Sequence, residues 1–190
     1  MLGLNSEKAK RVRRRTRGPA VFICLHLFAL TWSSVLVCKD SLRKDLVKQQ
    51  EKLNRETSVV GKVKALIKIS DIHLRSARQE IKKSELTAAD RDLDLYKESV
   101  ERALEMLKSS DRNAQKNPAG FKEFEISLRK QLRVLDDLRS HYSFDQVQTI
   151  HAAITTAKAA QEAMLEEIFG PENTRRRREK ESRNSGQPKE

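Results

Sequence analysis

The sequence predicts an all-α protein, on three observations. Apolar residues recur at steps of three and four through most of residues 42–168, which places them on one stripe of each helix. Almost no run alternates with a period of two, so we expect no sheet. Turn-forming residues such as those at 113–120 separate the stripes. The connections at 84–87 and 142–143 are short, which favours antiparallel neighbours, either as two helical hairpins in series or as one elongated antiparallel bundle.

The first apolar stripe is the longest. Nine of its twelve positions are apolar, and they predict one helix of about 60 Å at about 1.5 Å per residue. Gly61 stands beside three β-branched residues, which predicts a bend near residues 57–61. The stripe consists of Leu42, Leu46, Gln49, Leu53, Glu56, Val60, Val63, Ile67, Ser70, Leu74, Ala77 and Ile81.

Three shorter stripes follow. We expect Thr87 to cap the second helix and residues 113–120 to end it, because Pro118 lacks a donor and Gly120 tolerates unusual backbone angles. Ser143 opens a predicted capping box for the fourth helix, which residues 170–171 end. The expected core positions are Leu93, Tyr96, Val100, Ala103, Leu104 and Leu107, then Phe121, Phe124, Leu128, Leu132, Leu135 and Leu138, then Val147, Ile150, Ile154, Ala157, Met164, Leu165 and Ile168. Asp90 lies three residues after Thr87, and Gln146 lies three residues after Ser143, which is the spacing of a capping partner.

The first forty residues predict export. Seven cations precede Gly18-Pro19, and residues 20–38 carry no charged side chain. Clustered Lys and Arg stay on the cytoplasmic side of a membrane, so the chain that follows should be exported. For residues 1–38, a cleaved signal peptide fits the length and composition better than an uncleaved N-terminal membrane anchor, and both stay open. The cations are Lys8, Lys10, Arg11, Arg13, Arg14, Arg15 and Arg17.

The formal net charge of +12 is concentrated at the two ends. Residues 1–38 hold seven basic and one acidic residue, and residues 171–190 hold seven and four. Residues 39–170, the predicted helical domain, hold 25 basic and 22 acidic residues and are therefore nearly balanced. Both cysteines lie in the export segment, which excludes a disulfide framework and leaves core packing to hold the domain.

The tail at residues 171–190 has no apolar residue large enough to anchor a fold, so we expect it to be disordered. Four adjacent arginines, Arg175, Arg176, Arg177 and Arg178, form the candidate anion-binding patch. Outside the cytoplasm, anionic lipid head groups, an acidic envelope polymer or an acidic protein would fit it. The tail lacks aromatic side chains for base stacking, which disfavours nucleic acid. A solubilising tail with no dedicated partner is the alternative.

Histidines and carboxylates give no metal or cofactor site. No histidine beyond the export segment has Glu three residues before it, the spacing that a carboxylate-bridged metal pair requires. Asp71 and His73 lie on different sides of a helix, so we expect a solvated pair. His141 and His151 flank the last turn, and we expect a cation near helical carbonyls and an ordinary surface residue.

Nucleophilic and acid–base catalysis have no motif either. The chain lacks a Gly-x-Ser-x-Gly elbow, a Gly-rich phosphate loop and a His-Glu-x-x-His pair, so we expect no enzyme. Paired carboxylates and opposite charges at helical spacing predict solubilising helix faces instead. They are Asp92/Asp94, Asp136/Asp137, Glu166/Glu167, Glu98/Arg102, Glu101/Glu105/Lys108 and Glu125/Arg129.

Three functional hypotheses follow. The first is an exported (periplasmic, secreted or envelope-associated), non-enzymatic helical interaction or structural protein. Its partner would be an unidentified protein, an anionic envelope component or a second copy. The second is the same domain held by a single-pass membrane anchor. The third is a basic nucleic-acid-binding protein whose N-terminal segment is not an export signal, and a cytoplasmic location would favour it over the other two.

Overall fold

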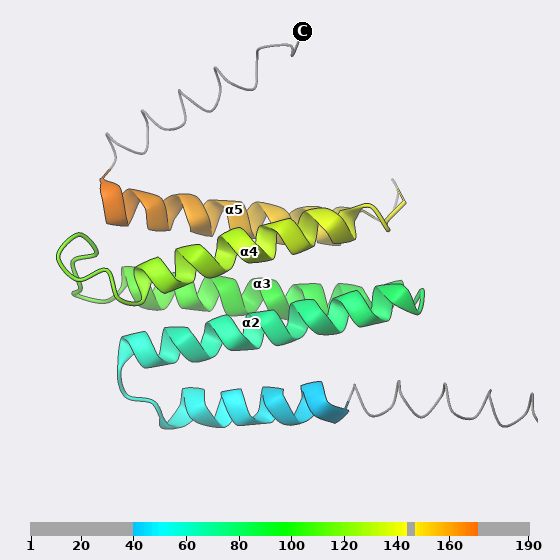
Figure 1. Cartoon of the computed structure of the whole chain (residues 1–190), viewed down its shortest axis with the longest axis horizontal. Helices are drawn as coiled ribbons and strands as arrows, with labels where there is room; N and C mark the ends of the chain where they lie inside the picture. Colours follow the sequence, from blue (N-terminus) through cyan, green and yellow to red (C-terminus); the bar gives the residue numbers. More distant parts are fainter. Residues whose placement is uncertain (1–39, 144–146, 171–190) are drawn as a thin grey trace, which may run out of the picture. The chain divides into compact units, whose positions relative to one another are not determined.

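In the computed structural model, residues 40–143 and 147–170 are described. They form five helices and no strand, which confirms the all-α prediction for this part of the chain (Figure 1). The first helix covers residues 40–55. It is followed by α2 (Val59–Lys82), α3 (Leu86–Lys108), α4 (Phe121–Arg139) and α5 (Gln148–Phe169). Residues 1–39 and 171–190, which carry the predicted export segment and tail, lie outside the described residues.

The single long helix predicted up to Ile81 is wrong, because the chain leaves the helical conformation at residues 56–58. Ser58 caps α2 by accepting the main-chain N–H of Gly61 at 3.1 Å. The Glu56 carboxylate accepts from the hydroxyl of Ser58 at 2.9 Å and from its N–H at 3.2 Å. These bonds favour the charged carboxylate, so the pKa of Glu56 is lowered. The predicted bend is therefore a complete break with its own cap.

Gly61 contributes to this break in a different way from the one predicted. It lies inside α2, and a Cβ built on it would stand 2.2–2.4 Å from the Glu56 side chain. The absence of a side chain at position 61 thus leaves the room in which Glu56 folds back over the start of α2.

The predicted N-caps of two other helices are also wrong. Helix α3 begins at Leu86 with Glu85 as its N-cap, so Thr87 lies inside the first turn. Ser84 reverses the chain just before it with a positive φ of 63°. Helix α5 begins at Gln148 after Val147, later than a cap at Ser143 would place it, and residue 146 lies outside the described residues. Gly170, with φ 80°, ends α5 as predicted.

The helices pack as two hairpins that share one core. Helix α2 contacts α3 and α4 contacts α5, and the hairpins meet through α2 with α4 and α3 with α5 (Figure 1). The third predicted stripe is buried throughout, from Phe121 to Leu138. Leu53 joins this core from the first helix, and Leu46 packs against it. Of the long predicted stripe, six positions are only partly buried: Leu42, Leu46, Gln49, Glu56, Val60 and Ile67.

Candidate functional site

The fold sorts charges that are nearly balanced along the sequence. Helix α2 carries six basic and two acidic residues, and α4 carries five and four. Helix α3 carries four basic and six acidic residues, and α5 carries one and three. Because α2 contacts α4 and α3 contacts α5, the domain has a more basic α2–α4 side and a more acidic α3–α5 side.

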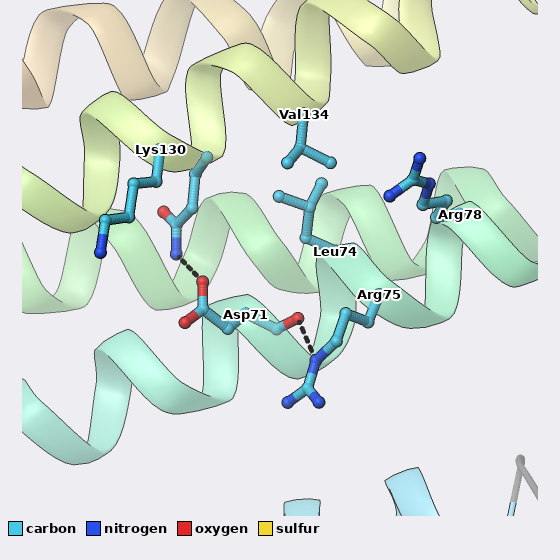
Figure 2. Close-up of a pocket in the computed structure, with 7 residues that line it drawn as sticks. Asp71, Leu74, Arg75, Arg78, Lys130 and Val134 are labelled. Atoms are coloured by element: carbon cyan, nitrogen blue, oxygen red, sulfur yellow. Dashed lines mark hydrogen bonds between the residues drawn. The ribbon is translucent and has the colours of Figure 1, made fainter.

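A cleft of about 230 Å³ opens between α2 and α4 on the basic side. Its apolar part is made by Leu74 and Val134, whose side chains point toward one another in Figure 2. Two cations come from α2 and one from α4, and one carboxylate and one amide complete the lining. We call this site the α2–α4 cleft. It is lined by Asp71, Leu74, Arg75, Arg78, Lys130, Gln131 and Val134.

The three cations of the cleft are only weakly neutralised. Arg78 lies 3.4 Å from Asp137 on α4, but both side chains are at least half exposed, and such ion pairs contribute little. Arg75 donates from Nε to the main-chain oxygen of Asp71 at 3.3 Å, which leaves the two terminal nitrogens of its guanidinium at the surface. Lys130 is exposed and has no hydrogen-bond or ion-pair partner among the described residues. The cleft therefore suits a ligand with negative charge beside an apolar group.

A polar network holds the wall of the cleft from inside the core. Gln131, 3 % exposed, donates its amide to Ser70 at 2.9 Å and to the carboxylate of Asp71 at 2.6 Å. Its carbonyl accepts from the hydroxyl of Tyr96 on α3 at 3.3 Å. Burial, followed by the nearby charge of Asp71, raises the pKa of Tyr96, so the hydroxyl stays protonated as a donor. The network joins three helices and fixes Asp71 and Gln131 in the lining of the cleft.

The solvated Asp71–His73 pair predicted from the sequence does not form. His73 is 6 % exposed, and its Nδ1 lies 3.2 Å from the Asp92 carboxylate on α3. His141 and His151 are exposed. Within residues 40–143 and 147–170, no group of three or more His, Cys, Asp or Glu side chains gathers where a metal ion would bind.

Of the predicted opposite-charge pairs, Glu125 and Arg129 meet, with Arg129 Nε 3.1 Å from the carboxylate. Glu125 is buried rather than solvated, and it also accepts from Gln161 of α5 at 3.2 Å. No ion pair is present between Glu98 and Arg102 in the described part of α3. These α3 charges are therefore available to other partners.

Arg175 to Arg178, the site residues predicted from the sequence, lie outside the described residues. The α2–α4 cleft was not predicted from the sequence. One feature of the sequence could have indicated a basic surface on α2. Cations recur along this helix at helical spacing and are exposed: Lys64, Lys68, Arg75, Arg78 and Lys82.

Comparison with known proteins gave no relative: no protein-family model, no curated protein and no solved structure matches this chain. None of the described helices combines the length and the apolar character that crossing a bilayer requires. That finding on the helices does not extend to the predicted export segment, which lies outside the described residues.

Proposed function

We propose that this chain is an exported, non-enzymatic helical interaction protein that binds an acidic partner surface through the α2–α4 cleft. The observation that carries the proposal is the gathering of Arg75, Arg78 and Lys130 around the apolar pair Leu74 and Val134. Export is inferred from the cationic head and the uncharged segment at 20–38.

The packing behind the α2–α4 cleft supports a binding role for this face of the domain, because it holds the face in one conformation. Gln131 and Asp71 are held by a buried network, so one wall of the cleft is preformed. A preformed site loses less conformational entropy when a partner binds. The helices act as a four-helix bundle that presents fixed charges, and the basic side favours partners with negative charge through steering as well as contact.

A membrane-anchored form of the same domain has the same cleft and differs only in the fate of residues 1–38. A nucleic-acid-binding protein is the second candidate, favoured by the cation row along α2. The lining of the cleft includes no aromatic side chain on which a base could stack, which makes this candidate weaker.

Two measurements test the proposal. A reporter fused after Gly170 should be active outside the cytoplasm, and activity confined to the cytoplasm would contradict export. The full-length protein, purified in neutral detergent, should bind immobilised polyglutamate and be released by salt. The cleft variant Arg75→Glu, Arg78→Glu, Lys130→Glu should be released at clearly lower salt.

The matched control reverses three exposed cations outside the cleft, Lys116→Glu, Arg139→Glu and Lys158→Glu. It has the same net charge as the cleft variant, so it separates the local site from overall charge. Equal release of both variants would mean that the cleft is not the binding surface.

A further inference from the structure

An exposed apolar side chain interrupts the acidic side of the domain. Leu95 on α3 is 42 % exposed, whereas most large apolar side chains of α3 are buried or partly buried. Four exposed carboxylates follow one row of α3 beside it, at steps of four, three and four: Asp94, Glu98, Glu101 and Glu105.

These carboxylates are mostly unpaired. Asp94 accepts from Lys97 at 3.1 Å. Glu98, Glu101 and Glu105 have no hydrogen-bond or ion-pair partner through their side chains among the described residues. We call Leu95 with these three glutamates the α3 patch. It combines one apolar side chain with negative charge, which is the composition that the α2–α4 cleft is suited to bind.

We propose that the α3 patch of a second copy of this chain docks in the α2–α4 cleft. Leu95 of one copy would contact Leu74 and Val134 of the other, since a volume of about 230 Å³ accommodates a leucine side chain. The glutamates would then lie near Arg75, Arg78 and Lys130. This proposal rests on the proposed function, because it names the acidic partner of the same cleft.

The remaining charges of the two surfaces are also opposite in sign, positive on α3 and negative at the cleft. Arg91 and Arg102 lie along the Leu95 row of α3 and are exposed. Asp71 lines the cleft, and Asp137 stands beside Arg78. A second copy therefore offers positive charge as well as negative charge to this mixed lining. The phosphates of a nucleic-acid backbone or of anionic lipid head groups would bring negative charge without the positive charge that suits Asp71 and Asp137, and they would leave Leu95 without a role.

The two surfaces belong to different helices, so the contact is heterologous. One copy that has filled its cleft still presents its own α3 patch to a third copy. Contacts of this kind generate rings or open chains of subunits rather than closed dimers alone. Self-association of this form would give the domain a structural role.

Two complementary variants of the full-length protein test the proposal. The cleft variant Arg75→Glu, Arg78→Glu, Lys130→Glu retains its α3 patch but loses the basic cleft. The patch variant Glu98→Lys, Glu101→Lys, Glu105→Lys retains its cleft but loses the acidic patch. Each protein is purified in neutral detergent, checked for helicity by circular dichroism, and examined by sedimentation velocity across concentration and salt.

We expect the wild-type protein to form assemblies that weaken as salt rises. Each variant alone should associate at least about tenfold more weakly, because charge reversal replaces attraction by repulsion. A mixture of the two variants should recover assembly, since the intact patch meets the intact cleft and the reversed patch, now Lys, meets the reversed cleft, now Glu, with opposite charge. The control Lys116→Glu, Arg139→Glu, Lys158→Glu should assemble as the wild-type protein does.

A second measurement localises the contact. With Cys24→Ser and Cys38→Ser in both copies, Leu95→Cys in one copy and Val134→Cys in the other should cross-link with a short bismaleimide. Cross-linking should fail when the second cysteine is placed at Lys116 instead.

Two results would overturn the proposal. A wild-type protein that stays monomeric excludes self-association. Assembly that persists in each variant alone places the contact on another part of the chain, for example the N-terminal segment. If the protein stays monomeric but polyglutamate binding still requires the cleft, only the second-copy proposal fails. If polyglutamate binding ignores the cleft variant, the proposed function fails as well.

Discussion

The side chain of Gln131 on α4 donates to the carboxylate of Asp71 on α2 at 2.6 Å and thereby joins the core to the surface of the cleft. The same side chain accepts from Tyr96 of α3 inside the core. The side-chain amide of Gln131 thus connects three helices. Changes at this position should affect stability and the shape of the cleft together.

Gln131→Ala should lower the free energy of unfolding by about 1–3 kcal/mol, because the Tyr96 hydroxyl is left buried without an acceptor. Urea unfolding followed by circular dichroism measures this. Adding Tyr96→Phe should recover part of the loss, since it removes the orphaned donor. Gln148→Ala, at an exposed position, is the control. Equal stability of Gln131→Ala and the control would show that the network contributes nothing.

Leu132→Asp should destabilise the protein by more than about 3 kcal/mol, because it places a charge where only 9 % of the side chain is exposed. Ile126→Asp makes the same change in the same helix at a side chain that is 38 % exposed, and it should cost far less. Thermal unfolding of both variants checks the difference. A Leu132→Asp protein as stable as Ile126→Asp would remove Leu132 from the core.

Ser58→Ala should lower the free energy of unfolding by about 1 kcal/mol, because α2 loses the side chain that accepts the Gly61 N–H. The Glu56 carboxylate loses a donor in the same variant. Thr57→Ala changes an exposed neighbour and should have little effect. Denaturant titration of the two variants compares them, and equal midpoints would argue against a cap at Ser58.

Glu123 should make stability fall in acid. Partial burial of its carboxylate raises the pKa, but the N–H of Gly120 at 2.7 Å and the charge of Lys64 act in the opposite direction, and the net pKa is lowered. A pKa that is lower in the folded state gives stability that is present above the ordinary value of 4.5 and is lost as pH falls through the folded value.

The measurement is urea unfolding between neutral pH and about pH 3, the range in which carboxylates titrate. Glu123→Gln should be less stable at neutral pH and should lose less stability on acidification. Parallel pH curves for the wild-type protein and Glu123→Gln would mean that this carboxylate does not contribute.

The apolar pattern predicts the helices well, because helix packing repeats at the spacing that the sequence displays. Phe121, Leu128 and Leu135 recur every seven residues and are all buried. The break at Ser58 was harder to predict, since it depends on a local competition. Glu56 and Ser58 bond one another and the start of α2, and this arrangement replaces a continuous helix. Stripe spacing alone carries no trace of that competition.

The binding surface needed tertiary information. Whether Arg75 and Lys130 act together depends on the contact of α2 with α4, which no spacing within either helix reveals. His73 illustrates the same limit, because its partner Asp92 comes from the neighbouring helix rather than from its own. A chain with 25 basic and 22 acidic residues at 39–170 looks balanced until its helices are assigned to sides.

The most direct measurement compares the cleft with the tail. Full-length proteins are eluted from polyglutamate in a salt gradient. They are the wild-type protein, the cleft variant, its charge-matched control, and a tail variant in which Arg175, Arg176, Arg177 and Arg178 are all changed to Gln. The cleft variant should elute first and well before the Lys116→Glu, Arg139→Glu, Lys158→Glu control, because its three cations act at one preformed site. The tail variant should show a smaller shift. Elution of the cleft variant together with the control, with a large shift only in the tail variant, would contradict a binding role for the α2–α4 cleft.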